Sequence, residues 1–267
     1  MIKYGIMKSA VFFDIDGTLW DFKGFMPDSV REAMKRLHEN GHMTFLCTGR
    51  SRGNIYDERL LSLPLTGIVA ACGNHIEKDG EMLYEHLLEW DHLCEIMDVL
   101  REAKMPFIVE GPVDHWMNTE DFPNDWYVGN LWKSLGDHAL RLDAIAEGGR
   151  FSKLSASIPD DADLARAEQA LAETMDFINH GNQVVEIIPK GSGKDEGIRR
   201  TCELLDIPHE ATYAVGDSSN DLGMLRYAAH GICMGNGTAE AKEAAEYVTA
   251  ALKDDGLYKA MEHYGLI

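Results

Sequence analysis

The chain has 267 residues, of which 45% are hydrophobic and 26% charged, and its 25 Lys and Arg against 45 Asp and Glu give a formal net charge of −20. This length and composition suit a globular protein with one large or two smaller domains. Nucleic-acid binding depends on Lys and Arg that neutralise phosphates, so the charge excludes a nucleic-acid partner and favours divalent cations.

Cysteine usage and hydropathy indicate the compartment. The five cysteines are scattered and include no Cys-x-x-Cys pair, which is typical of free thiols in a reducing environment. The N-terminal segment lacks the apolar stretch of a secretory signal, and no run approaches the roughly 18 apolar residues of a membrane span. We therefore expect a cytoplasmic protein without a membrane partner.

The first third of the chain alternates strands with a helix. Residues 9–13, 42–47 and 67–72 are short apolar runs that predict strands. Residues 27–41 place apolar side chains at helical spacing and end on a glycine, so they predict a helix between the first two strands.

The last third repeats this alternation. Residues 194–207 and 220–229 predict helices, residues 211–216 and 230–235 predict strands, and residues 238–249 predict a short helix and a final strand. Short strands alternating with helices are typical of a parallel sheet with helices on both faces. The two thirds together predict an α/β fold whose core is a doubly wound, Rossmann-like parallel sheet.

The middle of the chain has a different pattern. A hairpin turn at Asp79-Gly80 precedes a helix at 90–104, and a strand at 151–158, a helix at 161–175 and a strand at 183–188 follow. This α+β pattern has apolar faces of its own. We therefore expect an inserted α+β cap domain at residues 81–186, and a core domain made of residues 1–80 and 187–267.

Aromatic residues gather in one segment of the predicted cap. Trp116, Trp126, Trp132 and Tyr127 lie between residues 113 and 132. Aromatic side chains dominate small cores, so we expect them to build the core of the cap. The alternative is that some of them contact the leaving group of a substrate while the cap excludes water.

Acidic and hydroxyl side chains follow the predicted strands where the strands end. The stretch SAVFFDIDGTLW carries Asp14 and Asp16 directly after the first strand, Thr48-Gly49 follows the second, and Asp217 follows a strand of the last third. Ligands of open parallel sheets bind at the carboxyl ends of strands, near the point where strand order reverses. We therefore expect these side chains to meet at one edge of the sheet.

Clustered carboxylates at such an edge indicate phosphoryl transfer. The carboxylates repel one another unless a cation lies between them, and Mg²⁺ prefers carboxylate oxygens. We expect Mg²⁺ on Asp14, Asp16 and Asp217, and expect Asp14 to attack phosphorus and form an aspartyl-phosphate. Asp16 is expected to protonate the leaving alkoxide and then to deprotonate water.

The remaining polar residues of this edge are expected to hold the phosphate. The Thr48 hydroxyl and the Gly49 amide are placed to donate to phosphate oxygens, and Lys194, which opens a helix, to stabilise the charge of the transition state. Asn220 and Asp221, within the motif GDSSND, are expected to hold the waters of the metal and the lysine in place.

Each motif alone is typical of a turn, a helix cap or a surface lysine, but their order is specific. DIDGT, CTGR, the lysine of GSGKDEG and GDSSND resemble the four motifs of the haloacid dehalogenase (HAD) superfamily of phosphohydrolases. The tail MGNGTAEAKEAAEYVT resembles the Cof-type branch, in which an α/β cap follows the third core strand. The resemblance covers residues 9–80 and 187–257.

The resemblance implies a Mg²⁺-dependent phosphatase that cleaves phosphate monoesters of small metabolites, such as a sugar phosphate, a nucleotide or a cofactor phosphate. It implies a nucleophile, Asp14, and an acid/base, Asp16. The substrate phosphate is assigned to Thr48, Gly49, Lys194 and Asn220, and the metal to Asp14, Asp16, Asp217 and Asp221. We expect a monomer or a small homo-oligomer.

The chain departs from the branch at two places. It has Asn74-His75 where Asn-Gly is usual after the third strand, and Gly237 where alanine is common. His75 is therefore a candidate for altering substrate preference. Arg50 has two interpretations, a phosphate clamp or a partner of a core acid.

Three other functions compete with the phosphatase. A phosphomutase or phosphotransferase of the same superfamily would pass the phosphoryl group to a sugar. A phospho-acceptor signalling domain also uses clustered acids, a threonine and a lysine, but it lacks an inserted domain and an acid two residues after the acceptor. A non-catalytic binding protein is disfavoured because the set from Asp14 to Asp221 is intact.

Overall fold

The computed structural model describes residues 8–117, 119, 122–179, 181 and 183–267. Its contacts divide the chain into two compact units, which we call the core unit and the inserted unit. The core unit comprises the described part of Met1–Thr48 with Asp57–Tyr84 and Gly193–Ile267, and the inserted unit comprises Gly49–Tyr56 and the described part of Glu85–Ser192. The first seven residues, in which the sequence predicts no secretory signal, lie outside the described residues.

The chain passes from the core unit to the inserted unit at residue 85 and returns at residue 193, whereas the sequence predicts these boundaries at residues 81 and 187. Residues 81–85 form a strand that continues the core sheet. The segment Gly49–Tyr56 joins the inserted unit although the sequence places it in the core. Ser51 Oγ lies 2.7 Å from His115 Nε2, and the Tyr56 hydroxyl donates a 2.8 Å hydrogen bond to the Ser134 carbonyl, which explains this membership.

An eight-stranded sheet forms the core unit, in the order β14-β13-β12-β1-β2-β3-β4-β5. The strands are β1 (Ala10–Phe13), β2 (Met43–Cys47), β3 (Gly67–Ala70), β4 (His75–Lys78), β5 (Glu81–Glu85), β12 (Thr212–Gly216), β13 (His230–Cys233) and β14 (Tyr247–Val248). β1 pairs in parallel with β2 on one side and β12 on the other, and β4 is antiparallel to β3. The predicted α/β class with a parallel core is confirmed.

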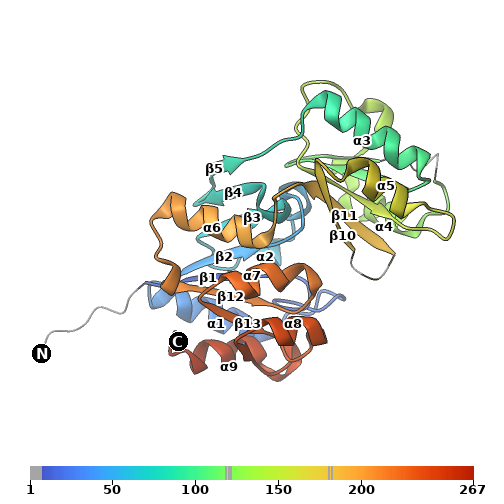
Figure 1. Ribbon diagram of the computed structural model, residues 1–267. Helices are drawn as coiled ribbons and strands as arrows, with labels where there is room; N and C mark the ends of the chain where they lie inside the picture. The colour runs from blue at the N-terminus through green and yellow to red at the C-terminus, as the bar shows by residue number, and fades with distance from the viewer. Residues whose placement is uncertain (1–7, 118, 120–121, 180, 182) are drawn as a thin grey trace, which may run out of the picture. The chain divides into compact units, whose positions relative to one another are not determined.

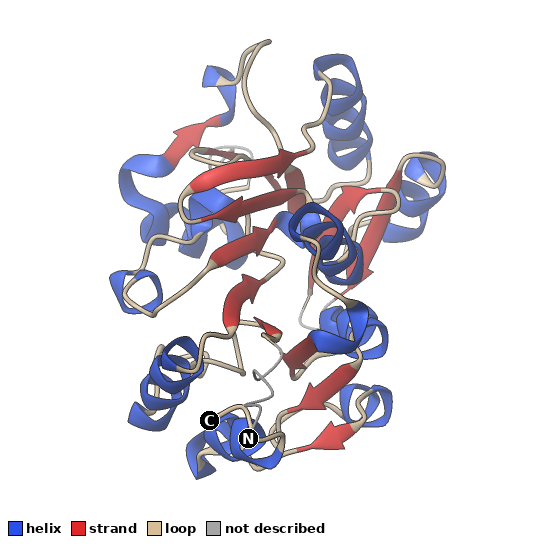
Figure 2. Ribbon diagram, turned by 90° about the vertical axis from the view of Figure 1, so that its left-hand side faces the viewer, coloured by secondary structure: helices blue, strands red, loops and turns tan. Residues whose placement is uncertain are grey.

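Helices cover both faces of this sheet, as Figures 1 and 2 show. They are α1 (Asp28–Glu39), α2 (Glu58–Leu61), α6 (Lys194–Leu205), α7 (Leu222–Tyr227), α8 (Ala239–Ala244) and α9 (Gly256–His263). Ile198 of α6 and Met224 of α7 pack with Phe12 and Phe45, whose rings stack 5.0 Å apart. On α1 the buried residues follow the predicted helical period and include Val30.

A six-stranded sheet forms the inserted unit, in the order β10-β11-β9-β6-β7-β8. Its strands are β6 (Phe107–Glu110), β7 (His115–Met117), β8 (Ala139–Arg141), β9 (Lys153–Ser157), β10 (Met175–Asn179) and β11 (Val184–Pro189). Helices α3 (Trp90–Glu102) and α5 (Leu164–Leu171) share an apolar cluster with one face of this sheet, through Leu154 and Ile187 among others. Helix α4 (Trp126–Leu135) packs with Ile108 and Met117 of the other face.

The aromatic residues of the inserted unit mostly serve its packing. Trp116 belongs to the cluster shared with α3 and α5, and Trp132 packs against the cluster shared with α4. Trp126 is 48% exposed. The sequence analysis assigned no secondary structure to residues 126–135, which form the helix α4. Asp125 begins it by accepting a 2.9 Å hydrogen bond from the Val128 amide.

Within the described part of the chain, no helix has both the length and the apolar composition that a membrane span requires.

Candidate active site

The register of the core sheet brings the ends of three strands together. Phe13, the last residue of β1, pairs with Val215 of β12 and with Leu46 of β2. The chain continues past these residues to Asp14, Asp217 and Thr48 at the same edge. This edge is also where the strand order reverses, because β2 and β3 extend the sheet to one side of β1 and β12 to β14 to the other.

Lys194 connects two of the predicted acids. It is the first residue of α6, it is buried, and its Nζ donates 2.6 Å hydrogen bonds to Asp14 Oδ1 and to Asp221 Oδ1. The sequence analysis expected the ammonium at this edge. Charge-assisted bonds of this length hold the two carboxylates in fixed orientations.

Asp221 is fixed from its other side by the backbone. Its Oδ2 accepts hydrogen bonds from the amides of Asp217 (2.8 Å) and Ser218 (2.9 Å), and the side chain of Ser218 completes a capping box. The loop after β12 is therefore folded around this carboxylate. Asp217 in turn accepts a 3.3 Å hydrogen bond from the Thr18 hydroxyl.

Among the described residues, the carboxylates of Asp14, Asp217 and Asp221 offer oxygens that all lie within 4.8 Å of one another. Burial raises the pKa of Asp14 well above its ordinary value; the Lys194 ammonium opposes this shift, and the neighbouring carboxylates add to it. Burial and the Asp221 carboxylate raise the pKa of Asp217 to about 7. Burial is the largest cause of both shifts, and the neighbouring carboxylates add a surplus of negative charge at this edge.

Lys194 does not remove that surplus. Burial would lower its pKa, but the carboxylates of Asp14 and Asp221 raise it well above the ordinary value, so the side chain is a cation. One ammonium faces three buried carboxylates. A hard divalent cation would relieve the remaining repulsion, and an all-oxygen donor set is the kind that Mg²⁺ takes, so these residues fit the expected metal.

Gly17 permits the close approach of Asp217. Its φ is +91°, and a Cβ at this position would overlap the Asp217 carboxylate. The Gly17 carbonyl accepts a 2.9 Å hydrogen bond from Asn236 Nδ2, and Asn236 Oδ1 accepts from the Leu252 amide. Sequence reasoning gave Asn236 no role, although it lies in the motif MGNG directly after β13.

Asp16 stands apart from the buried acids. Its side chain is half-buried, and Oδ1 accepts a 2.9 Å hydrogen bond from Trp20 Nε1. The carboxylate is therefore held by the turn that follows β1. The sequence analysis assigned Asp16 to the metal as well as to acid/base chemistry, and the cluster of Asp14, Asp217 and Asp221 forms without its carboxylate.

The predicted phosphate ligands lie in three places. Thr48 is buried; its amide donates to the Val69 carbonyl, and its carbonyl accepts from the Cys72 amide. Asn220 accepts a 2.8 Å hydrogen bond from the Ser218 hydroxyl. Gly49 follows Thr48 in the chain but packs within the inserted unit.

Three further residues singled out by sequence have distinct surroundings. His75 is buried on β4, where Nε2 lies 3.2 Å from Glu77 Oε2. Arg50 donates a 3.4 Å hydrogen bond to the Asn54 carbonyl. A Cβ on Gly237 would lie 2.6 Å from Cys233 Sγ, so glycine makes room for this cysteine where the branch commonly has alanine.

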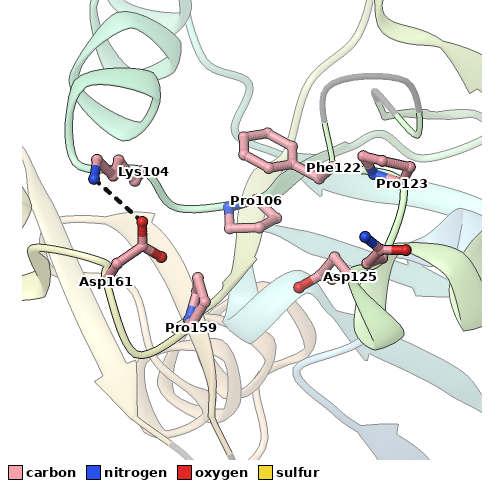
Figure 3. Close-up of a pocket in the computed structure, with 8 residues that line it drawn as sticks. Lys104, Pro106, Phe122, Pro123, Asp125, Pro159 and Asp161 are labelled. Atoms are coloured by element: carbon pink, nitrogen blue, oxygen red, sulfur yellow. Dashed lines mark hydrogen bonds and ion pairs between the residues drawn. The ribbon is translucent and has the colours of Figure 1, made fainter.

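The inserted unit has a hollow of about 410 Å³, drawn in Figure 3, lined by prolines, Phe122 and a few polar side chains. Lys104 and Asp161 pair with each other across 3.2 Å at its rim. Asp125 caps α4 and accepts from the Ser157 hydroxyl. Because these charged groups are engaged within the protein, the described residues of the hollow offer no set of groups comparable to the acids around Lys194.

The chain is similar to known hydrolases and phosphatases. The profile of the haloacid dehalogenase-like hydrolases matches residues 11–261. YkrA of Bacillus subtilis, named only provisionally as a phosphatase, is 28% identical over 260 residues, which cover 97% of this chain and 99% of the relative. YitU of the same organism, named a 5-amino-6-(5-phospho-D-ribitylamino)uracil phosphatase, is 26% identical over 278 aligned positions, which cover 95% of this chain and 96% of the relative.

A solved HAD subclass IIB sugar phosphatase superposes with a TM-score of 0.81 at 26% identity, and the match covers 97% of this chain and 100% of the other. The chain therefore belongs to the haloacid dehalogenase-like hydrolases. Within that family it is a Cof-type phosphatase, as the motifs in the sequence indicate.

Proposed function

We propose that this phosphatase is a Mg²⁺-dependent enzyme that cleaves phosphate monoesters of small metabolites through an aspartyl-phosphate on Asp14. The observation that carries the proposal is the buried group of Asp14, Asp217 and Asp221 around Lys194 at the carboxyl edge of the core sheet. Asp14, the proposed nucleophile, is thereby held next to the Lys194 ammonium. It also lies beside carboxylate oxygens that suit a divalent cation.

Asp14 and Asp217 are proposed to hold Mg²⁺, and Asp221 is proposed to complete the metal site. Bound there, Mg²⁺ supplies positive charge that draws electron density from phosphate oxygens and offsets the carboxylates. Asp221 also orients the lysine and the loop after β12, through one oxygen on Lys194 and the other on two amides. Asp16 is also proposed to contribute to the metal site, because it lies in the turn after β1 that carries Asp14.

In the first half-reaction an oxygen of Asp14 forms a bond to phosphorus as the bond from phosphorus to the ester oxygen breaks. The leaving alkoxide takes the proton of Asp16. In the second half-reaction the Asp16 carboxylate takes a proton from water, and the resulting hydroxide attacks phosphorus. The bond from phosphorus to Asp14 then breaks, which releases phosphate and restores the carboxylate.

Thr48, Gly49, Lys194 and Asn220 are proposed to bind the phosphate. Lys194 is the strongest candidate on physical grounds, because it is a buried cation bonded to the nucleophile and stabilises charge as it moves to the phosphoryl oxygens. Thr48 directly follows β2, the strand that pairs with β1, which supports a place for it at the same edge.

The substrate is proposed to be a small phosphorylated metabolite. Two similar proteins carry names that specify a ribitylamino-uracil phosphate and a sugar phosphate, and both names describe small monoesters. The net charge of −20 disfavours polyanionic substrates. We further propose that the enzyme acts in the cytoplasm as a monomer or a small homo-oligomer.

The test is phosphate release from a panel of sugar phosphates, nucleotides, and flavin and pyridoxal phosphates, with Mg²⁺ and then with a chelator. Release that depends on the metal is the expected result. Release that is unchanged after chelation would contradict the metal dependence. Transfer to an added sugar without free phosphate would instead indicate a phosphotransferase.

A further inference from the structure

A row of polar side chains, buried except for the partly exposed Glu186, lies on one face of the inserted unit's sheet. His115 on β7 and Lys153 on β9 both stand directly opposite Glu110 on β6, and Glu186 on β11 stands opposite Ser155. We call His115, Glu110, Lys153 and Glu186 the buried charge cluster. Lys153 Nζ lies 3.2 Å from a carboxylate oxygen of Glu110 and 3.2 Å from one of Glu186.

The cluster is costly if stability alone is considered. Lys153 is 1% exposed and Glu110 is 3% exposed, so both charges have left water. Apolar side chains of similar volume often give equal or greater stability than a buried ion pair. Burial would raise the pKa of Glu110, but Lys153, His115 and a hydrogen bond from Ser155 together hold the pKa below its ordinary value. Glu110 and Lys153 therefore remain charged in the folded protein. A contribution to stability does not explain these buried charges, so another role is needed.

The cluster contacts the loop Gly49–Tyr56 at three points. Ser51 is fully buried, and its hydroxyl lies 2.7 Å from His115 Nε2. A Cβ on Gly49 would overlap the Glu186 carboxylate, so the backbone of Gly49 lies directly against it. A Cβ on Gly53 would lie 2.9 Å from His115 Cε1. The loop therefore contacts Glu186 at one end of the cluster and His115 at the other.

We propose that the buried charge cluster positions this loop for phosphate binding, with Glu186 acting through Gly49 and His115 acting through Ser51. The inference rests on the proposed function, in which the Gly49 amide binds the substrate phosphate. The loop is joined directly to Thr48, so its conformation decides where that amide points. A loop held in its binding conformation before the ligand arrives loses less entropy on binding.

The test compares Glu186→Gln, which removes the charge and keeps the shape, with Glu102→Gln. Glu102 lies in the same unit and forms an exposed ion pair with Arg166, so it is a matched control. For Glu186→Gln we expect the KM and the inhibition constant of inorganic phosphate to rise about tenfold while kcat changes less than about threefold. Glu186→Asp is expected to recover part of the loss.

Hydrogen exchange of the amides in Gly49–Tyr56 provides a measurement that does not depend on activity. We expect the amides of this loop to exchange faster in Glu186→Gln than in wild type. The amides of the described strands should exchange at the wild-type rate. If wild-type protein releases no phosphate from any substrate, the proposed function fails while exchange still tests the positioning. Values for Glu186→Gln equal to those of Glu102→Gln in both measurements would overturn the inference.

Ser51→Ala covers the case in which Glu186→Gln does not fold. This variant removes a single hydroxyl and leaves the four side chains of the cluster in place. We expect a rise of about threefold in the inhibition constant of phosphate and faster exchange of the loop amides, as for loss of one hydrogen bond. A Ser51→Ala protein that matches wild type in both respects would overturn the part assigned to His115.

Discussion

Trp20 Nε1 donates a 2.9 Å hydrogen bond to Asp16 Oδ1, four residues earlier in the chain. Trp20 is almost fully buried, and its carbonyl also accepts the 2.7 Å hydrogen bond of the Gly17 amide. The guanidinium of Arg59 lies 5.0 Å from the centre of its ring. The indole is thus a rigid support for the carboxylate proposed to be the acid.

Trp20→Phe tests that support. Phenylalanine keeps most of the ring packing and removes the donor, and a hydrogen bond to a charged group contributes about 1.5–3 kcal/mol. We expect kcat for alkyl phosphates to fall about tenfold, with KM changed little. Steady-state kinetics on an alkyl phosphate measures this. Trp90→Phe, on α3 of the inserted unit, is the matched control; equal losses in the two variants would contradict a specific role for Trp20.

Asp16→Asn tests the acid itself. An alkoxide leaving group needs a proton in the transition state, whereas an aryloxide needs little help. We expect a loss of about a hundredfold or more for alkyl phosphates and a much smaller loss for aryl phosphates in the first half-reaction. Single-turnover rates with one substrate of each kind separate these effects. Equal losses on both substrates would show that Asp16 is not the general acid.

Asp14→Asn tests the nucleophile. The amide keeps the shape but cannot form the acyl-phosphate, so we expect turnover to fall at least about a thousandfold. Stability of the metal-free protein should not fall, because the substitution removes a carboxylate whose pKa burial has raised. Phosphate release and urea unfolding measure the two results, with the exposed Asp160→Asn as the control. Turnover near that of wild type would exclude the aspartyl-phosphate route.

The meeting of Asp14, Asp217, Asp221 and Lys194 follows from sequence because it depends on local rules. Each acid comes directly after an apolar strand or in the loop that follows it, and the carboxyl ends of neighbouring parallel strands share one edge. Lys194, the fourth residue of this group, lies at the start of a helix, as the sequence predicts. These relationships need the strand order but no knowledge of side-chain packing.

The supports of the site depend on contacts between distant residues. Asn236 reaches Gly17 across 219 positions of sequence, and no periodicity indicates such a pairing. The stretch FSKLSASI predicts a strand, but nothing in it indicates that Lys153 and Ser155 are buried. Lys153 is paired there with Glu110 and Glu186, which come from other strands. Strand existence was therefore predictable, whereas the charge cluster was not.

His115 gives the inserted unit a defined response to pH. Its Nε2 is engaged with Ser51, and its Nδ1 is buried without a hydrogen-bond partner among the described residues. Burial lowers the pKa of His115; Glu110 and Asp114 oppose this shift, and Lys153 and His138 add to it. A second proton on this ring would leave a buried N–H without an acceptor.

The direction of the stability change follows from that lowered pKa. The unfolded chain takes up the proton near the ordinary pKa of about 6.5, and the folded protein does so only at lower pH. Stability from neutral His115 is therefore complete above about pH 6.5 and is lost as pH falls below it. His115→Gln cannot titrate, so its free energy of unfolding should decline less between about pH 8 and pH 5. The expected difference is about 1.4 kcal/mol for each unit of pKa shift.

Urea unfolding of wild type and His115→Gln across this range measures the effect, since the titration of the buried acids of the core unit is common to both proteins and cancels in the comparison. The exposed His138→Gln is the control for replacing a histidine in the same unit. A decline in His115→Gln as steep as in wild type would mean that this ring does not carry the acid sensitivity. A shallower decline confined to His115→Gln would show that acid acts on the buried charge cluster beneath Ser51.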